Sequence, residues 1–211
     1  MARSPSFCGV ILAAGESSRM GRDKALLPWP PGTAGRSTFL SATIELLQAP
    51  SDMVIVVAGK NAESLQTIVD AAAGYLVVNP HPERGQFSSL QVGLQEVLNH
   101  GRDAAMIALV DRPPAQPATL ASLCEAFSHA YESDKWAVVP EYGGRHGHPI
   151  LIGREMIEAF LRAPATSNAR EVEHALEQRI LYVPVEDPNV AANVDTPEDY
   201  ERLPKARVQS P

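Results

Sequence analysis

The sequence has few cysteines, few aromatic residues and no long hydrophobic run. Its two cysteines, Cys8 and Cys124, form no CxxC motif and are too few for a disulfide framework, so we expect buried thiols. The longest apolar runs, such as 104–110, are far shorter than the about 20 residues that cross a bilayer, and the first residues lack an apolar signal core. These features argue against a disulfide scaffold and a membrane protein, and we expect a cytoplasmic location.

Positive charge is also scarce. The 211 residues include 18 Lys and Arg against 25 Asp and Glu, which gives a formal net charge of −7. A chain that binds polyanions by charge alone has the opposite balance, so neither nucleic acid nor an anionic membrane is an expected partner. The length suits one domain, and we expect a single unit over residues 1–211 with its core at about 7–203.

Short apolar runs alternate with amphipathic stretches. Apolar or β-branched runs predict strands at 8–13, 53–58, 75–78, 104–110, 136–139, 149–152, 180–185 and 192–194. Apolar residues at helical spacing predict helices at 37–48, 61–73, 88–99, 117–130, 154–161, 168–178 and from Pro197, with Asn61 and Thr196 as N-caps. Continuous apolar strands between amphipathic helices predict a layered α/β fold, in which helices cover both faces of a mostly parallel sheet.

In such a sheet, ligands bind beyond the carboxyl ends of the strands. The loop after the first predicted strand reads LAAGESSRMGRDK over residues 12–24. Its glycines and small residues let backbone N–H groups approach an anion, and Arg19 and Lys24 add positive charge for a phosphate. The loop is neither a P-loop nor a GxGxxG motif, which disfavours a dinucleotide oxidoreductase. From the residues alone, a surface turn with solvated charges is an equal alternative.

The string LAAGESSRMGRDKALLP resembles the first motif of the MobA-like nucleotidyltransferases, especially the molybdenum cofactor cytidylyltransferases. Further segments resemble the family's motifs in the same order, namely NP at 79–80 with Gly85 and SSL at 88–90, Asp111 before Pro113, GHPIL at 147–151, and NVDTPED at 193–199. The resemblance covers roughly residues 7–203. It implies the Rossmann-like, three-layer α/β/α sandwich of the nucleotide-diphospho-sugar transferases.

Members of this family transfer a nucleoside monophosphate from an NTP to a phosphorylated small-molecule acceptor and release pyrophosphate. An acceptor phosphate is already an anionic nucleophile, so catalysis depends on positioning and charge neutralisation. The resemblance implies that Asp111 and Asp195 bind Mg²⁺ and that Lys24, assisted by Arg19, contacts the triphosphate. It further implies nucleotide contacts by Leu12, Ala13, Ala14, Gly15, Asn79, Ser88 and Ser89. The plainer alternatives are a turn or capping role for Asp111, capping roles for Asp195 and Ser88, and a solvated charge for Lys24.

The base and the acceptor are less defined. The Ala13-Ala14-Gly15 loop resembles the version linked to CTP, and a methyl group at Ala14 would crowd a purine, so we expect CTP rather than GTP. Arg112 stands where the family usually has Gln; it could bind an anionic acceptor or point to solvent. The segment 28–36 is longer than the family's turn. Both departures put the acceptor in question, with molybdopterin as one candidate.

Several alternatives stay open. His146 and His148 are too few for a metal site, and we expect their loop to shape the acceptor pocket. The chain could act on another phosphorylated metabolite, transfer a different nucleotide such as GMP, bind nucleotides without turnover, or carry a metal cofactor without consuming NTP. The sequence does not predict an oligomeric state.

Overall fold

The computed structural model describes residues 7–33, 37–164 and 166–205. Within these ranges, eight strands form one sheet in the order β3-β2-β1-β4-β7-β5-β6, and β8 pairs with β5. The strands are β1 (Phe7–Leu12), β2 (Ser51–Ala58), β3 (Tyr75–Val78), β4 (Ala104–Leu109), β5 (Ala137–Tyr142), β6 (Arg145–His146), β7 (Ile150–Gly153) and β8 (Ile180–Pro184). Residues 34–36 of the long segment 28–36 lie outside the described residues.

The sheet is mostly parallel, as the apolar runs predict. Strands β1 to β4 are parallel to one another, and β5 is parallel to β8. Strand β7 lies between β4 and β5 and is antiparallel to both, and β6 forms a short hairpin with β5. The direction of β7 is not visible in the sequence, because a short buried strand has the same apolar run in either direction.

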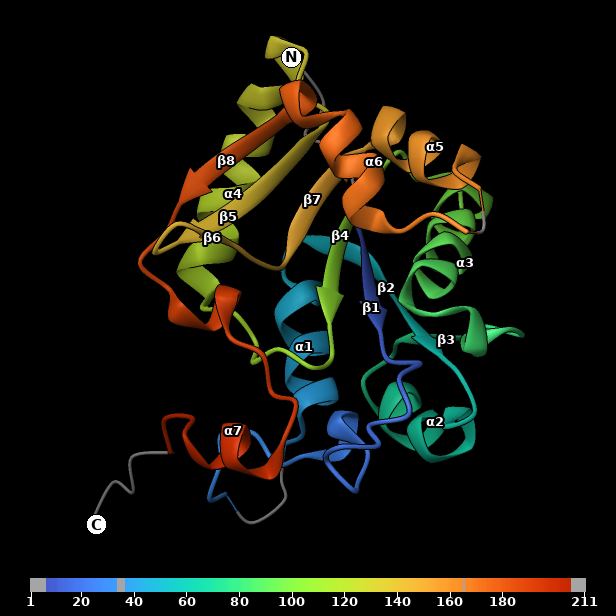
Figure 1. Ribbon diagram of the computed structural model, residues 1–211, viewed down its shortest axis with the longest axis vertical. Coiled ribbons are helices and arrows are strands. Elements are labelled where there is room, and N and C mark those ends of the chain that lie inside the picture. Colours follow the sequence, from blue (N-terminus) through green and yellow to red (C-terminus); the bar gives the residue numbers. More distant parts are fainter. Residues whose placement is uncertain (1–6, 34–36, 165, 206–211) are drawn as a thin grey trace.

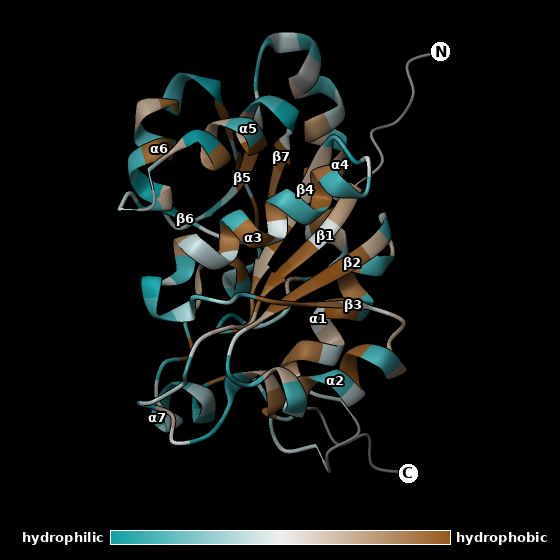
Figure 2. Ribbon diagram, turned by 90° about the vertical axis from the view of Figure 1, so that its right-hand side faces the viewer, coloured by the Kyte–Doolittle hydropathy of each residue, from teal (hydrophilic) through white to brown (hydrophobic). Residues whose placement is uncertain are grey.

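Helices cover both faces of the sheet (Figure 2). They are α1 (Phe39–Gln48), α2 (Ala62–Ala71), α3 (Gln86–Asn99), α4 (Pro117–Ala130), α5 (Arg154–Arg162), α6 (Ala169–Ala175) and α7 (Pro197–Glu201). Short 3-10 turns are η1 (Lys24–Leu26), η2 (Pro82–Arg84), η3 (Tyr131–Ser133), η4 (Glu177–Arg179) and η5 (Pro188–Ala191). The three-layer α/β/α prediction is therefore confirmed.

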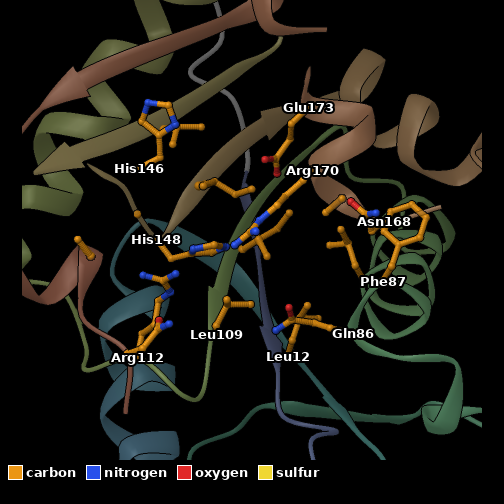
Figure 3. Close-up of a pocket in the computed structure, with 18 of the residues that line it drawn as sticks. Leu12, Gln86, Phe87, Leu109, Arg112, His146, His148, Asn168, Arg170 and Glu173 are labelled. Atoms are coloured by element: carbon orange, nitrogen blue, oxygen red, sulfur yellow. The ribbon is translucent and has the colours of Figure 1, made fainter. Parts of the chain in front are cut away.

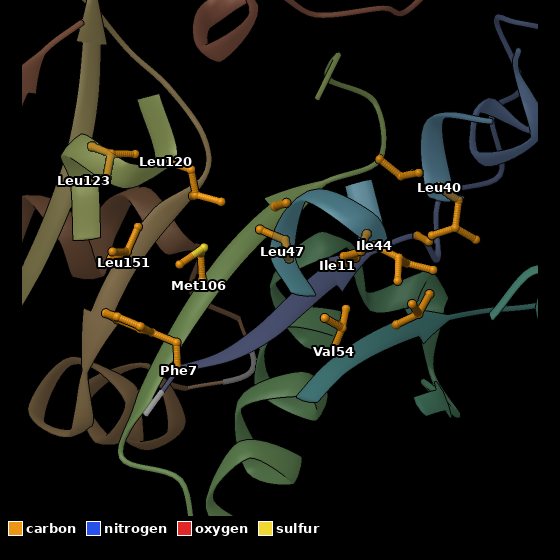
Figure 4. Packing of buried hydrophobic residues seen from close by; sticks show 14 of the residues in the cluster. Phe7, Ile11, Leu40, Ile44, Leu47, Val54, Met106, Leu120, Leu123 and Leu151 are labelled. Atoms are coloured by element: carbon orange, nitrogen blue, oxygen red, sulfur yellow. The ribbon is translucent and has the colours of Figure 1, made fainter. Parts of the chain in front are cut away.

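The two hydrophobic cores follow from the alternation of side chains along the strands. Val10 and Ile11 are adjacent in β1, fully buried, and belong to opposite cores. Helices α1, α2 and α4 pack on the Ile11 side, where Leu40, Ile44 and Leu47 bring the apolar stripe of α1 onto the sheet (Figure 4). Helices α3, α5 and α6 pack on the Val10 side. Both faces of the sheet are thereby closed, which leaves its ends for ligands.

The carboxyl ends of β1 and β4 point toward the loop after β1 and toward α7 (Figure 1). A small hydrophobic cluster of Met20, Leu27, Phe39 and Val194 joins that loop to the segment before α7. The Val194 N–H also donates to the Asp111 carbonyl at 2.9 Å. Residues from the two ends of the chain therefore meet at one end of the sheet.

Some expected elements differ in the structure. Residues 192–194 are not a strand, because the Val194 N–H pairs with a single carbonyl beyond β4 rather than with a neighbouring strand. Asn61 precedes α2, but its side chain makes no capping bond and contacts the loop after β1 instead. Thr196 caps α7 as predicted. Among the described residues, no helix has the length and apolar content needed to cross a membrane.

Candidate active site

The loop after β1 is shaped by Ser17, which also fixes Lys24. Ser17 has a positive φ of 49°, and its carbonyl accepts the N–H groups of Met20 at 3.0 Å and Gly21 at 3.2 Å. Its hydroxyl accepts the backbone N–H of Lys24 at 3.1 Å. The tight turn at Ser17 therefore sets the point at which the Lys24 side chain leaves the loop.

Lys24, Arg19 and Asp195 form one ion cluster. Lys24 Nζ lies 2.7 Å from Asp195 Oδ1, and an Arg19 guanidinium nitrogen lies 3.2 Å from the same oxygen. The Lys24 side chain is 11% exposed and that of Arg19 is 71% exposed, so water weakens the Lys24 pair far less. The hydrogen bond from Lys24 is the main reason that the pKa of Asp195 is lowered. The structure thus brings together three residues that the family motifs single out.

Asp111 follows β4 and has an unpartnered, buried carboxylate oxygen. Among the described residues, its Oδ1 accepts no hydrogen bond, whereas most buried polar atoms in proteins have a partner. The capping role considered for Asp111 would supply an N–H partner, and its side chain has none in the part of the chain described here. Asp195 does not cap α7 either, because Thr196 does. The buried Oδ1 of Asp111 is therefore available to a cation, whereas Oδ1 of Asp195 already pairs with Lys24 and Arg19.

These two aspartates suit Mg²⁺ better than a metal bound only by protein side chains. The described residues contain no group of three or more His, Cys, Asp and Glu side chains that could hold a metal ion. Mg²⁺ commonly takes one or two carboxylates and completes its shell with water and substrate phosphates. The orphaned Oδ1 of Asp111 is the feature that fits this cation.

A cavity of about 380 Å³ opens beside the loop after β1. It is lined by Leu12, Ala14, Gly15, Glu16, Pro82, Glu83, Gly85, Gln86 and Ser89. Its wall is tightly packed at Gly59, where a Cβ atom would lie 2.9 Å from the Ala14 carbonyl oxygen and 3.1 Å from Pro82 Cβ. The cavity therefore places Ala14 and Gly15 on one wall and the start of α3 on the other.

Asn79, Ser88 and Ser89 form a hydrogen-bonded group next to this cavity. The Asn79 amide donates to the hydroxyls of Ser88 at 2.9 Å and Ser89 at 3.0 Å. Helix α3 begins at Gln86 after Gly85, which has a φ of 92°, so Ser88 is inside the helix and is not its N-cap. Of the three residues, Ser89 alone is among those that line the cavity. Asn79 and Ser88 lie behind the wall and fix the approach of α3.

A larger cleft of about 960 Å³ lies between α3, α6 and the turn from β6 to β7 (Figure 3). Four arginines line it, namely Arg84, Arg112, Arg145 and Arg170. None of the four forms an ion pair with any other described residue. The single carboxylate on the lining is that of Glu173. The cleft therefore has an uncompensated positive charge in a protein that is acidic overall.

Arg112 and His148 meet inside this cleft. Arg112 does not point to solvent, since one Nη donates to the Val190 carbonyl at 2.9 Å and its buried Nε has no partner among the described residues. Burial lowers the pKa of Arg112, and nearby Asp111 partly offsets this. Burial, reinforced by Arg112, lowers the pKa of His148 to about 3. His148 is therefore neutral at pH 7, while Arg112 keeps its charge.

Gly147 allows the turn before β7 to pack on η5. A Cβ atom at Gly147 would overlap the Val190 carbonyl and lie 2.8 Å from Val190 Cβ. The same carbonyl accepts the His148 N–H at 3.0 Å and the Arg112 guanidinium. The glycine therefore allows one backbone carbonyl to position both cleft residues.

Replacing Gly147 by Ala should destabilise the fold. The overlap is with backbone, which cannot rotate away, so we expect a loss of about 1–3 kcal/mol in the free energy of unfolding. Chemical denaturation of wild type and Gly147→Ala measures the difference. Gly143→Ala is the control for a loop glycine, because its Cβ would meet nothing within 4 Å, although its φ of 56° adds some strain. Equal losses in the two variants would contradict the packing explanation.

His146 occupies a different position from His148. Its ring stacks on Tyr182 with centroids 4.0 Å apart, and its Nε2 lies 3.6 Å from a Glu141 carboxylate oxygen. Both histidines line the large cleft, as expected for a loop that shapes a pocket. The sequence did not reveal Arg170, Glu173 and Tyr182 as lining residues, because charged or aromatic residues on short helices and edge strands usually face solvent.

Asn61 was also missed as a site residue. Its amide donates to the Ala13 carbonyl at 2.9 Å and to Asp23 Oδ2 at 2.7 Å, and its carbonyl oxygen accepts the Gly59 N–H at 3.0 Å. Asn61 therefore ties the end of β2 to both ends of the loop after β1. The Gly-Lys-Asn sequence directly after an apolar strand was the available signal.

Residues 9–180 match the family model described as the MobA-like NTP transferase domain. A probable molybdenum cofactor guanylyltransferase from Mycobacterium avium is 30% identical to the chain, and the alignment covers 98% of this chain and all of that protein. A molybdenum cofactor cytidylyltransferase from Escherichia coli is 27% identical, with 90% and 92% covered. Both kinds of nucleotide transferase are therefore similar to this chain over nearly its full length.

Two further similarities extend this picture. A nicotine blue oxidoreductase from Paenarthrobacter nicotinovorans is 30% identical, with 94% of this chain and 97% of that protein covered. The crystal structure of Rv0371c from Mycobacterium tuberculosis superposes with a TM-score of 0.73 at 28% identity and covers 95% of this chain and 97% of that one. Proteins named for different reactions are thus similar to this chain. Its activity therefore has to be inferred from the residues of the site rather than from the fold.

Proposed function

The chain belongs to the MobA-like NTP transferase family, and from this premise we propose that it transfers CMP from CTP to the phosphate of a molybdopterin-type acceptor. An oxygen of the acceptor phosphate attacks the α-phosphorus of CTP, the bond from that phosphorus to the bridging oxygen breaks, and pyrophosphate leaves. The proposal rests on the Lys24–Asp195 pair and the unpartnered carboxylate of Asp111, which the backbone hydrogen bond from Val194 to Asp111 brings to the same end of the sheet. Bound Mg²⁺, held by Asp111 and Asp195, would neutralise charge on the phosphates.

The protein's own residues mainly position and neutralise. Lys24 is a point charge for the triphosphate, and exposed Arg19 can fork onto a phosphate. No general base is required, since a phosphate attacks as an anion. The neutral His148 is consistent with this, because it adds a hydrogen-bonding nitrogen to the cleft without adding charge.

CTP is the proposed nucleotide because of Ala14. Ala14 lies on the wall of the smaller cavity, where a glycine would leave more room for a purine. Relatives of both specificities exist, so the proposal has a direct test. Ala14→Gly should lower the ratio of kcat/KM for CTP to that for GTP by about tenfold, the effect of one methyl group in a tight pocket. An unchanged ratio would show that this loop does not select the base.

Thermal denaturation with CTP, GTP, ATP and UTP, each with Mg²⁺ or with EDTA, tests nucleotide binding. At a ligand concentration 100 times its Kd, binding should stabilise the fold by about 2.7 kcal/mol, which raises Tm measurably. We expect the largest rise for CTP and its loss in EDTA. The absence of a rise with any nucleotide at millimolar concentration would contradict the proposed function.

Pyrophosphate release separates transfer from other uses of the same fold. With CTP, Mg²⁺ and molybdopterin, the proposal predicts one pyrophosphate per acceptor consumed. Stabilisation by CTP without pyrophosphate release would indicate a binding module, and release with a different phosphorylated metabolite would reassign the acceptor. NADH and NADPH belong in the same thermal panel, since one relative is named an oxidoreductase.

A further inference from the structure

Two residues that line the large cleft, Arg112 and His148, each have a buried polar atom without a partner among the described residues. Five such side-chain atoms occur in the described residues, and three of them belong to Asp111, Arg112 and His148. A buried polar atom without a partner costs about 1–3 kcal/mol, so such an atom is expected to meet a water molecule or a ligand. Asp111 is explained by the proposed metal. The proposed metal does not explain the unpartnered Arg112 Nε and His148 Nδ1.

Arg170 approaches the same place from the opposite wall. It lies on α6, whereas Arg112 follows β4, and Figure 3 shows both guanidinium groups directed toward His148. Glu173 is three residues further along α6 and is the natural partner for Arg170. The two form no ion pair in the described structure, and Arg170 makes no side-chain hydrogen bond there. Arg170 therefore extends into the cleft despite having an acidic neighbour.

We propose that Arg112, Arg170 and His148 form a subsite for a phosphate monoester, in which the two guanidinium groups hold the acceptor's phosphate from opposite walls. This inference rests on the proposed function, because it assigns the acceptor end of the same reaction. Arg112 directly follows Asp111 and interacts electrostatically with its carboxylate, so a phosphate held by Arg112 would lie near the carboxylate assigned to the metal. The subsite thus presents the attacking oxygen to the nucleotide.

The donors favour a phosphate over a singly charged group. Each guanidinium presents a planar fork that matches two phosphate oxygens. One Nη of Arg112 is used by Val190, which leaves its remaining N–H groups for the ligand. His148, being neutral, can donate one N–H without adding a third positive charge. Two cations and one neutral donor complement a dianion, and Glu173, which interacts with Arg170, lowers the net positive charge that the ligand meets.

A purely structural role explains Arg112 only in part. Arg112 and Arg145 donate to the adjacent carbonyls of Val190 and Ala191, and these bonds anchor η5. Arg170 has no such bond among the described residues, so holding the fold together does not explain where it points. Arg170→Gln is therefore the cleaner variant. Arg112→Lys is measured together with Arg112→Gln, because lysine keeps the positive charge but lacks the planar guanidinium that contacts two phosphate oxygens.

The test is a calorimetric titration of inorganic phosphate, with and without saturating Mg²⁺ and the non-hydrolysable α,β-methylene analogue of CTP. Wild type should bind phosphate in both conditions. Arg112→Gln and Arg170→Gln should each weaken binding about tenfold or more, as expected for a lost charge-assisted bond. Arg84→Gln is the matched control, since Arg84 lines the same cleft and likewise has no ion pair among the described residues. It should change the Kd less than about twofold.

Three results would overturn the subsite. The first is the absence of saturable phosphate binding by wild type, and the second is unchanged binding in both Arg112→Gln and Arg170→Gln. The third is equal weakening in Arg84→Gln, which would indicate that phosphate is attracted by the overall positive charge of the cleft. Arg112→Lys should bind more tightly than Arg112→Gln and more weakly than wild type. Failure of the nucleotide analogue to bind would contradict the proposed function alone, because the titration without nucleotide still reports on the subsite.

Discussion

Replacing Asp111 by Asn should lower kcat for pyrophosphate release by about a thousandfold and change the stability of the fold little. A metal that neutralises phosphate charge contributes several kcal/mol to the transition state, and about 1.4 kcal/mol corresponds to tenfold in rate. The neutral amide binds Mg²⁺ poorly. Because Oδ1 of Asp111 accepts no hydrogen bond among the described residues, the substitution breaks none there, and it removes only the electrostatic interaction of Asp111 with Arg112. Activity should therefore fall sharply while stability changes little.

Asp187→Asn is the matched control for this variant. Asp187 is also buried, but its carboxylate accepts N–H groups of Gln116 at 2.7 Å and Asn189 at 3.1 Å and the Thr119 hydroxyl at 2.9 Å. Its replacement should cost about 1–3 kcal/mol of stability and change kcat little. Turnover assays and urea denaturation of both variants provide the comparison. A large loss of stability in Asp111→Asn would show that this carboxylate supports the fold and would remove the main argument for a metal there.

The strands and the end of the sheet that carries the site are predictable from local sequence. Apolar runs locate the strands, and residues directly after parallel strands gather at one end, which identifies the loop at 12–24 and Asp111. The cluster of Lys24 with Asp195 is different. These residues are 171 positions apart, and their pairing follows from similarity to a family rather than from any periodicity.

Other parts of the site depend on tertiary structure alone. Arg170 and Glu173 have the spacing of a solvated helix pair, and nothing local indicates that both side chains line the cleft. The sequence predicts a start of α3 two residues late, because Ser88 is a good capping residue. In the structure the helix begins at Gln86 instead, after Gly85, which has the positive φ. In both cases a favourable local pattern competes with a long-range contact that the sequence does not reveal.

Replacing Lys24 by Met should lower kcat/KM by about a hundredfold or more. Methionine keeps the length and apolar stem of lysine, so the change removes mainly the charge from a side chain that is 11% exposed. A preorganised donor in a partly buried site contributes about 2.7–4 kcal/mol to the transition state. Steady-state pyrophosphate release measures the loss. Lys60→Met is the control, because Lys60 also forms an ion pair, with Glu16, but its side chain is 73% exposed.

Lys24→Met should also change how the stability of the fold depends on pH. The Lys24 hydrogen bond lowers the pKa of Asp195, so in wild type this carboxylate stabilises the fold above the ordinary aspartate pKa of about 3.9 and loses that contribution as pH falls through its lowered value. In Lys24→Met the folded-state pKa of Asp195 should rise toward the unfolded value, which weakens this acid dependence. Tm measured from pH 6 down to about pH 3 tests this, with Lys60→Met as reference. Parallel acid profiles for wild type and Lys24→Met, together with unchanged turnover, would show that Lys24 neither holds Asp195 nor serves the triphosphate.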